Sequence, residues 1–576
     1  MITSGSIFHV SDNIIILIAS LPLPSQTIFS SIKWKLIKLI ISNFRGLKGS
    51  NVIDFTNSNI IFLIGQNNIG KSSFLRAYEF FIDPKQIAKT DDFNNYDYST
   101  PIVIEGIFEL DEEDSDDPDL KEKKEPNWIE KWVDENGFVK VRKTWSKPDR
   151  TFAKETYSPR DASWIENGFG GLHTKLTKYT PTPIAINAME DQASLEEKVN
   201  KLIQDDFIKK VRSEYPEEFK NLIDGVRKLQ ERITGSEAVE KLNLELNKHF
   251  QEVFAELTLK IQPAKEENIR LEDAFKKNHS ILVERAGTER KETFLQNGHG
   301  VIRQALFNFL TFLKRENEGN KKQYIILFEE PELFLHPKIA FKLRQSLYEL
   351  SKNSPYQILC ATHSPLMIDI SQPHSSLIRV IKNTGGETQT YQVGETLFGR
   401  DEEAKKWVQM VNRFNPHICE AFYADKVLLV EGDTETIVYR DLLTRFFPDE
   451  EIFVLNTGSK MNIPFFQEIL TAFHIEHYII HDSDDKEKKA AWTINTKIWE
   501  NVQASNNLSK RYVHIHNFED AHKITVKSDD GKPLTAYNFA QTIKDINTKV
   551  PCLEWLKDII YKNGIIHDPQ FIEDNV

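Results

Sequence analysis

The sequence predicts an α/β protein of more than one domain, built on buried parallel strands that end at candidate sites. An apolar run at residues 60–64 leads into Gly65-Gln66-Asn67-Asn68-Ile69-Gly70-Lys71-Ser72 and then into a helical pattern, the order of a phosphate-binding strand, loop and helix. Four later apolar runs are each followed by acidic or histidine side chains, as is typical where buried strands end at a site. They cover residues 324–328, 357–361, 427–430 and 477–481.

The composition is that of an ordinary multidomain protein. With 576 residues, and about 150 residues in a typical domain, the chain is expected to form three or four units. Hydrophobic residues make up 40% and charged residues 28%, which argues against a disordered or a membrane protein. The net charge of −13 argues against a protein that coats DNA by bulk charge. Any contact with nucleic acid must then come from local basic patches or from metal-bridged phosphates.

The cysteines and the N-terminal segment bear on the cellular compartment. Cys360, Cys419 and Cys552 lie far apart with no C-x-x-C pair, which excludes a zinc ribbon and a disulfide framework and fits a reducing cytoplasm. The apolar segment at residues 13–24 is too short to span a bilayer, and no Lys or Arg precedes it. We therefore expect no membrane association and interpret residues 1–36 as an extension. A wrongly chosen start site and a targeting role both stay open.

The loop after the first apolar run is expected to bind the phosphates of ATP. Gly65 and Gly70 allow the backbone N–H groups to turn inward, and the helix that starts near Lys71 directs its positive end toward the anion. Lys71 would reach the β- and γ-phosphates, and Ser72 would ligate Mg²⁺. The predicted nucleotide-binding residues of the loop are Gly65, Gln66, Asn67, Asn68, Ile69, Gly70, Lys71, Ser72 and Ser73.

The acidic run after residue 328 supplies the second half of an ATP site. Glu329 should hold Mg²⁺ through its shell, and Glu330 should orient or deprotonate the attacking water. The next apolar strand ends in Thr362-His363. A carboxylate pair and a histidine therefore follow two successive apolar strands.

These segments resemble an ABC-type ATPase of the RecF-like and SMC-like branch. The pattern I-x-N-F-R-G at residues 41–46 is similar to the opening of that branch, and His363 looks like its switch histidine, which senses the γ-phosphate. Residues 297–304 are the best match to the signature helix, although a full L-S-G-G-Q motif is absent. The resemblance implies an ATPase domain over residues 37–420.

At about residues 190–285 the spacing of apolar residues changes to that of helices, which indicates a helical insertion. Apolar residues at 195, 199 and 202, at 222, 226, 229 and 233, and at 250, 253, 254 and 257 form stripes with helical spacing. The stripes could pack on one another or against a second copy of the chain. ATPases of the kind that this chain resembles often dimerise through such an insert, which implies a homodimer or a homotetramer.

A second group of acidic residues follows the predicted strands after residue 420. Glu431 follows the strand at residues 427–430, and Glu435, four positions later, is expected on the same face of the next helical turn. Asp482 and Asp484 follow the strand at residues 477–481. Such carboxylates can hold two Mg²⁺ or Mn²⁺ ions about 3.5–4 Å apart, which clamp the attacking and leaving oxygens of a phosphodiester.

Glu-Gly after one strand and Asp-x-Asp after another resemble a Toprim domain, expected over residues 421–576. An ABC-type ATPase followed by a Toprim domain resembles the OLD (overcoming lysogenization defect) family of ATP-dependent nucleases and is similar to the nuclease subunit of the Gabija system. The resemblance implies that Glu519 completes the metal shell and that Lys532 stabilises charge on the cleaved phosphate. From composition alone, Lys532 would be an exposed turn lysine. The resemblance also implies double-stranded DNA as the substrate, a role in anti-phage defence and a helicase-like partner.

Two functional hypotheses follow. The first is a nucleotide-regulated, divalent-metal-dependent DNA endonuclease with Glu330, His363 and Lys532 as catalytic residues. The second is an ATP-driven DNA sensor or clamp whose Toprim domain is structural and whose partner is the effector. A primase or topoisomerase is disfavoured, because no zinc-binding primase module or tyrosine-bearing strand-passage domain is visible. Whether ATP activates or inhibits cleavage stays open.

Overall fold

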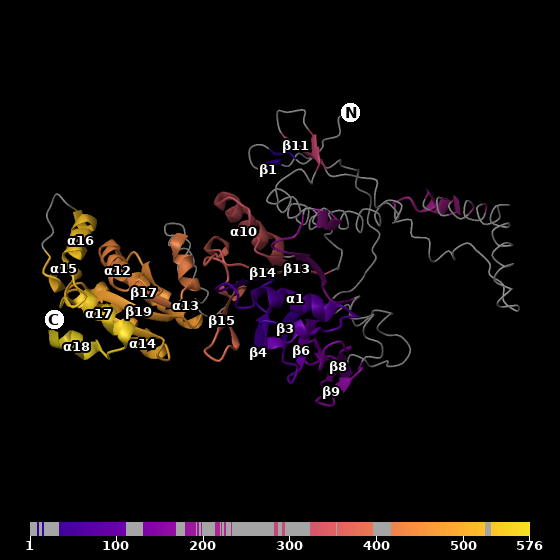
Figure 1. The fold of residues 1–576 in the computed structure, drawn as a ribbon, viewed down its shortest axis with the longest axis horizontal. Coiled ribbons are helices and arrows are strands. Elements are labelled where there is room, and N and C mark those ends of the chain that lie inside the picture. The colour runs from indigo at the N-terminus through magenta and orange to yellow at the C-terminus, as the bar shows by residue number, and fades with distance from the viewer. Residues whose placement is uncertain are drawn as a thin grey trace. The chain divides into compact units, whose positions relative to one another are not determined.

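The computed structural model describes residues 34–110, 131–168, 179–191, 323–352, 354–394, 416–524 and 531–575, together with short pieces elsewhere. The chain divides into two compact units, one formed by residues 1–29 and 189–317 and the other by residues 30–188 and 318–576. Every candidate site residue named above lies in the second, larger unit (Figure 1). Among the helices described, none has the length and apolar character needed to cross a membrane.

The smaller unit contains a sheet of short strands in the order β1-β2-β11-β12. These are β1 His9–Val10, β2 Ile14–Ile15, β11 Leu282–Arg285 and β12 Lys291–Thr293. Because β2 pairs with β11, the predicted extension and the predicted insertion contribute strands to one sheet. The apolar stripes of the insertion and the signature segment at residues 297–304 lie outside the described residues.

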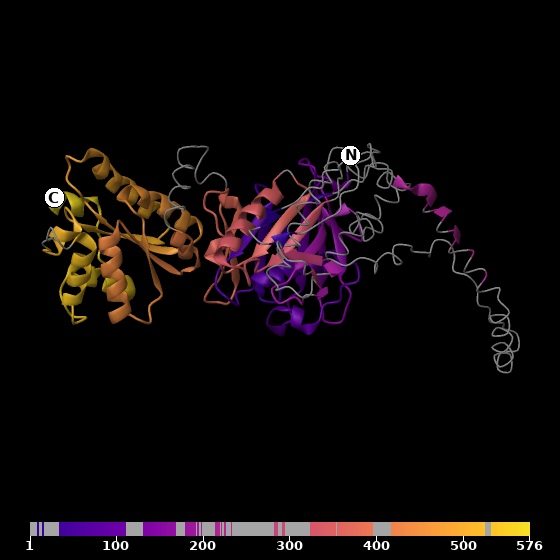
Figure 2. The ribbon, with the colours of Figure 1, turned by 90° about the horizontal axis from the view of Figure 1, so that it is seen from above.

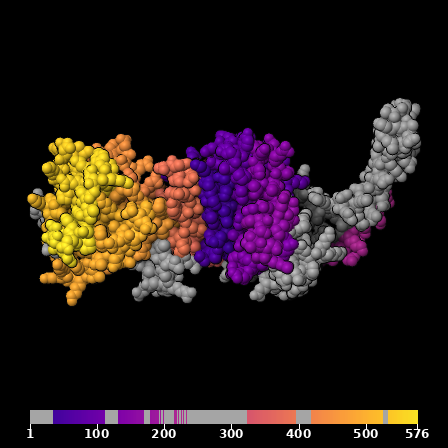
Figure 3. All heavy atoms as spheres, turned by 90° about the horizontal axis from the view of Figure 1, so that it is seen from below, coloured from indigo at the N-terminus to yellow at the C-terminus, as the bar shows by residue number. Residues whose placement is uncertain are grey.

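The first sheet of the larger unit is antiparallel, in the order β4-β3-β6-β7-β8-β9. Its strands are β3 Lys35–Phe44, β4 Leu47–Asp54, β6 Ile102–Glu109, β7 Phe138–Trp145, β8 Ala153–Ser158 and β9 Ser163–Glu166. Buried and partly exposed residues alternate along β6 and β7, so one face of the sheet packs on the core. These strands form the indigo and purple surface in Figure 3. Strands β3 and β4 form an antiparallel hairpin just before the phosphate loop.

The second sheet has the order β10-β13-β14-β5-β15-β16, and its first five strands are parallel. They are β10 Thr182–Ile186, β13 Tyr324–Glu329, β14 Tyr356–Ala361, β5 Ile60–Ile64, β15 Leu377–Lys382 and β16 Thr388–Gln392. Helix α1 (Lys71–Ile82) packs between the two sheets, and α10 (Pro337–Ser351) lies against β14 and β5. The predicted buried strands β5, β13 and β14 are confirmed.

The C-terminal part is a four-stranded parallel sheet in the order β18-β17-β19-β20. Its strands are β17 Lys426–Val430, β18 Ile452–Asn456, β19 Glu476–Asp482 and β20 Ser509–His514. One face packs on α12 (Asp433–Phe446), α16 (Gly531–Thr542) and α17 (Pro551–Tyr561). Helices α13 (Ile463–Ala472) and α14 (Lys489–Ala504) lie on the other face (Figure 1, Figure 2). Parallel pairing brings the C-terminal ends of the strands to one edge.

Candidate functional site

The loop between β5 and α1 is shaped by left-handed backbone positions. Gly65, Asn68 and Gly70 have φ angles of 146°, 61° and 101°. A Cβ atom on Gly65 would lie 2.4 Å from the carbonyl oxygen of Val380, so glycine is required at this position. Residues 66–68 are exposed, which leaves the loop accessible to a ligand.

Lys71, the first residue of α1, is 9% exposed. Its Nζ donates hydrogen bonds to the carbonyl oxygens of Gly65 (2.7 Å) and Gln66 (2.6 Å). Burial lowers the pKa of Lys71 to about 8, against the opposing effect of the carboxylates of Glu330 and Glu332. The ammonium is therefore held at the loop by two backbone carbonyl oxygens, and its contact with phosphates stays a prediction.

The acidic end of β13 lies beside this lysine. Glu330 has a left-handed φ of 45°, and its Oε1 lies 3.3 Å from Nδ1 of His363, which follows β14. Glu329 Oε2 accepts a hydrogen bond of 3.2 Å from the backbone N–H of Ala188, after β10. The structure therefore brings Glu330 and His363 together near Lys71, while the carboxylate of Glu329 contacts the chain after the neighbouring strand.

Glu332 is a third carboxylate of this site that was not predicted from the sequence. Its Oε1 accepts a hydrogen bond of 2.7 Å from Thr362 Oγ1. Its Oε2 is buried and has no hydrogen-bond partner among the described residues. Burial raises the pKa of Glu332, and its charge acts on Lys71. Its position three residues after Glu329, in the run E-E-P-E, was the signal in the sequence that could have identified it.

Glu431, Glu435 and Asp482 meet at the C-terminal ends of β17 and β19. The backbone N–H of Asp482 donates a hydrogen bond of 2.6 Å to Glu431 Oε1. Glu435 lies in the first turn of α12 and is only 5% exposed. Because α12 begins at Asp433, Glu431 precedes the helix, so the expected arrangement of both glutamates on one face of a helical turn is wrong.

Burial and mutual repulsion raise the pKa of these carboxyl groups. The pKa of Glu431 is raised by burial and then by the charge of Asp482, and that of Asp482 by burial and then by the charge of Asp484. The pKa of Glu435 is raised to about 7 by burial and by Asp482. A buried excess of negative charge of this kind is relieved when a divalent cation binds.

Glu519 and Lys532 reach the same cluster from α15 (Phe518–Ala521) and α16. Lys532 Nζ lies 3.1 Å from Glu519 Oε1, and the lysine side chain is 69% exposed. The charges of both residues act on the pKa of Glu435 and of Asp482. Lys532 is thus an exposed lysine that lies beside the carboxylates, and its expected role at the cleaved phosphate stays a prediction.

The donor set of this cluster fits a divalent ion. Within the described ranges, no three His, Cys, Asp or Glu side chains are already arranged as a metal-binding group. The side chains are nevertheless carboxylates only, partly or fully buried, and Mg²⁺ and Mn²⁺ prefer such oxygen ligands. The residues that could hold ions are Glu431, Glu435, Asp482, Asp484 and Glu519.

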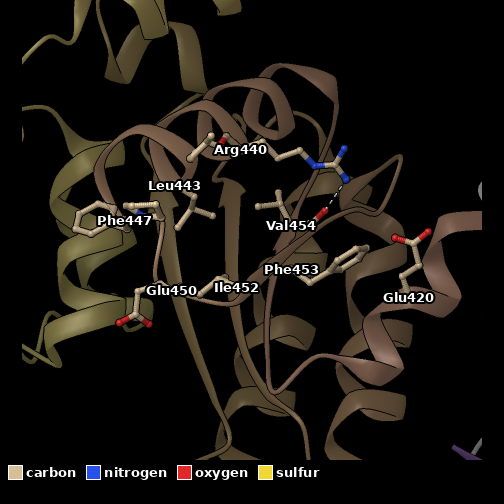
Figure 4. Close-up of a pocket in the computed structure, with 10 residues that line it drawn as sticks. Glu420, Arg440, Leu443, Phe447, Glu450, Ile452, Phe453 and Val454 are labelled. Atoms are coloured by element: carbon tan, nitrogen blue, oxygen red, sulfur yellow. Dashed lines mark hydrogen bonds between the residues drawn. The ribbon is translucent and has the colours of Figure 1, made fainter. Parts of the chain in front are cut away.

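A separate cavity of about 650 Å³ lies at the N-terminal half of β18 (Figure 4). Phe447 and Phe453 are among the residues that line it, and Arg440 Nη2 donates a hydrogen bond of 3.0 Å to the carbonyl oxygen of Val454. The carboxylates lie at the C-terminal ends of β17 and β19, which run parallel to β18 in the same sheet. The cavity therefore belongs to the opposite end of the sheet and is not part of the cluster.

Two family models match this chain, and the matched segments contain the loop at residues 65–73 and the carboxylates between residues 431 and 484, whereas Glu519 and Lys532 lie beyond them. The family model of the AAA ATPase domain matches residues 35–368, and that of the overcoming lysogenization defect protein-like TOPRIM domain matches residues 422–484. The chain is 25% identical to the Old nuclease of Escherichia phage P2 over 482 residues, covering 78% of this chain and 77% of that protein. It is 25% identical to endonuclease GajA of Bacillus cereus (strain VD045) over 488 residues, covering 79% and 76%. A solved SMC head, bound to the C-terminal winged-helix domain of ScpA, matches with a TM-score of 0.37 and 16% identity over 64% of this chain and 99% of that one.

Proposed function

Because the chain belongs to the AAA ATPase domain family and carries an OLD-like TOPRIM domain, we propose that it is a nucleotide-regulated, divalent-metal-dependent DNA endonuclease. The observation that best supports this proposal is the buried cluster of Glu431, Glu435 and Asp482, whose carboxylates repel one another at parallel strand ends. Homology to two proteins that are named nucleases supports hydrolysis of phosphodiesters as the reaction.

In this proposal the carboxylates of the C-terminal domain hold Mg²⁺ or Mn²⁺. Bound ions supply Lewis acidity and an activated water. Glu431 and Asp482 would hold the ions from the strand ends, and Glu435 from the first turn of α12. Glu519 would contribute a ligand from α15. The exposed ammonium of Lys532, which Glu519 holds at 3.1 Å, is placed to stabilise charge on the cleaved phosphate.

We propose ATP with Mg²⁺ as the nucleotide of the loop at residues 65–73. Lys71 would contact the β- and γ-phosphates. Ser72 would ligate the Mg²⁺ ion, and Glu329 would help to hold it. Glu330 positions the attacking water and His363 senses the γ-phosphate. The contact of 3.3 Å between Glu330 and His363 and the unpartnered oxygen of Glu332 support this assignment.

A direct contact connects the nucleotide loop with the TOPRIM sheet. Gln66 Nε2 donates a hydrogen bond of 3.1 Å to Asp425 Oδ2, and Asp425 immediately precedes β17, whose other end leads to Glu431. Arg379 lies on β15, the strand that pairs with β5. It donates hydrogen bonds to Asp425 Oδ1 (3.2 Å) and to the carbonyl oxygen of Ala424 (3.0 Å). A phosphate bound at Gln66 would change the environment of the hydrogen bond between Gln66 and Asp425. This link supports nucleotide control of the nuclease. The sign of that control is decided by experiment.

The proposal extends to the biological setting. Because both relatives are named nucleases, we propose DNA as the substrate. Double-stranded DNA, a role in anti-phage defence and a helicase-like partner, which the family resemblance implied, remain part of the proposal. We propose a homodimer or homotetramer that forms through the insertion. The three cysteines are buried free thiols, which supports action in a reducing cytoplasm.

Plasmid cleavage tests the proposed function. Purified full-length protein is incubated with supercoiled plasmid in Mg²⁺, Mn²⁺ or Ca²⁺, with and without ATP. We expect nicked or linear DNA with Mg²⁺ or Mn²⁺, and loss of this product by about 100-fold or more in Asp484→Ala, because a ligand is removed. Asp485→Ala is the matched control, since the Asp485 side chain is 59% exposed and lies next in the chain.

Two outcomes would contradict the proposal. Plasmid that stays supercoiled in every metal would exclude the nuclease and favour an ATP-driven DNA sensor or clamp. Wild-type cleavage by Asp484→Ala would place the active site outside the TOPRIM carboxylates.

A further inference from the structure

Two buried polar side chains hold the turn Asp482-Ser483-Asp484, which carries two candidate metal ligands. One is Lys460, which follows β18, and the other is His514, the last residue of β20. The turn is unusual because Asp484 has a left-handed φ of 58°, which residues other than glycine adopt rarely. Its geometry therefore depends on the groups around it.

Lys460 contacts this turn through its whole ammonium group. The side chain is 5% exposed, and Nζ donates hydrogen bonds to the carbonyl oxygens of Asp482 and Ser483 (3.2 Å for Ser483) and to Asp484 Oδ2 (3.0 Å). An ammonium group has three N–H donors. All three are used within the turn, so Lys460 orders the turn and is not available to bind a phosphate of DNA.

His514 holds the other candidate ligand from the neighbouring strand. It pairs with Asp482 across β19 and β20, and its carbonyl oxygen accepts a hydrogen bond of 2.8 Å from the N–H of Ser483. Nδ1 lies 3.1 Å from Asp482 Oδ1, and the ring is fully buried against Phe518 and Trp555. When Asp482 is ionised, as a metal ligand is, its carboxylate only accepts, so Nδ1 of His514 then carries the proton and donates. One oxygen of Asp482 is thereby fixed and the other stays available to an ion.

We propose that Lys460 and His514 are positioning residues of the nuclease site, which hold the carboxylates of Asp484 and Asp482 in the geometry that binds a divalent ion. This inference rests on the proposed function, because it concerns the same ions. Carboxylate ligands are commonly held by such outer hydrogen bonds, whose loss lowers metal affinity by about 10- to 100-fold. A purely structural role would lower stability and leave metal affinity unchanged.

The chain offers variants and matched controls that separate these roles. Lys460→Met removes the ammonium, His514→Leu removes the N–H donor, and His514→Asn keeps a donor close to the position of Nδ1. Lys510→Met removes a buried ion pair with Asp558 that does not contact the turn. His477→Leu removes an equally buried histidine about 16 Å away along β19, whose Nδ1 contacts only a backbone carbonyl among the described residues.

Two readouts are measured on full-length protein. The first is direct Mn²⁺ titration of the metal-free protein without DNA, followed by electron paramagnetic resonance of the free ion. The second is the Mn²⁺ concentration that gives half-maximal plasmid nicking. We expect Lys460→Met and His514→Leu to weaken Mn²⁺ binding by about tenfold or more, and His514→Asn to recover most of it. Lys510→Met and His477→Leu should bind Mn²⁺ within about twofold of wild type even where Tm falls.

The outcomes separate this inference from the proposed function. Wild-type Mn²⁺ affinity in both Lys460→Met and His514→Leu, with only a lower Tm, would overturn the inference and leave the nuclease proposal standing. A wild-type protein that neither binds Mn²⁺ nor cleaves DNA would refute the nuclease proposal itself. If Lys460→Met does not fold, equal Mn²⁺ affinities of His514→Asn and His514→Leu would overturn the inference.

Discussion

Glu435 connects stability with pH through a single buried side chain. Burial and the charge of Asp482 raise its pKa from an ordinary value of 4.5 to about 7 in the folded protein. The folded protein therefore holds this proton more tightly than the unfolded chain does. The contribution of Glu435 to the free energy of unfolding falls as pH rises from about 4.5 to about 7, and the loss is complete above that range.

Replacing Glu435 by glutamine should remove this pH dependence. Without divalent metal, we expect Glu435→Gln to have a Tm a few degrees above wild type at pH 8, with the difference shrinking toward pH 5. Buried histidines such as His477, whose pKa is lowered to about 4, titrate in both proteins and cancel, so the difference reports Glu435 together with its repulsion of Glu431. Thermal unfolding in EDTA from pH 5 to 8 measures it. A difference that is constant across this range would contradict the assignment.

The candidate metal ligands were more predictable from the sequence than the two side chains that contact them. Glu431, Asp482 and Asp484 were predicted because each follows an apolar strand. Lys460 and His514 could not be predicted in the same way, since a lysine after a turn and a histidine at a strand end are common in any fold. Their role depends on distances between strands that are remote in the sequence.

The phosphate loop is the element in which sequence and structure agree most fully. Strand β5, the loop with its left-handed glycines and helix α1 all lie where the pattern predicted them. Local chemistry explains this agreement, because β-branched residues favour the strand and glycine favours the turn. The amphipathic stripes of the insertion specify helices but not the surface against which they pack, since that contact is non-local.

Lys71→Ala tests the loop as a nucleotide site. We expect the substitution to weaken ATP binding by about 100-fold or more, because the cation held at the carbonyls of Gly65 and Gln66 is removed. Isothermal titration with ATP and Mg²⁺ measures the affinity. Lys48→Ala is the control, since Lys48 also bonds a backbone carbonyl, that of Gly385, but lies outside the loop. Tight ATP binding by Lys71→Ala would refute the assignment.

Across the larger unit, Arg379 joins the nucleotide-binding sheet to the TOPRIM sheet. It is 3% exposed, and Nη1 donates hydrogen bonds to the carbonyl oxygens of Phe473 (3.2 Å) and His474 (3.1 Å), just before β19. Nη2 bonds Asp425, which also accepts a hydrogen bond from Gln66 of the loop. One buried guanidinium therefore contacts the segments that lead into β17 and β19, the strands that carry the candidate ligands.

Asp425→Ala tests whether this contact transmits the nucleotide state. The Asp425 side chain is 65% exposed, so its removal should change stability little while it breaks the contacts with Gln66 and Arg379. We expect the ratio of cleavage rates with and without ATP to move toward one by at least about half, with ATP binding retained. Asp449→Ala, at an exposed aspartate of the same domain, is the control. An unchanged ratio in Asp425→Ala would exclude this route.

Because the TOPRIM cluster offers only oxygen ligands, its occupancy by metal depends on the concentration of free divalent cations in solution. Carboxylates compete for the same hard cations that ATP chelates. Adding ATP at constant total magnesium depletes the free ion and slows cleavage by mass action, with no signal passing through the polypeptide. A fall in the ATP concentration would release those cations, so the supply of ATP would govern cleavage even in a variant that lacks the Asp425 contact.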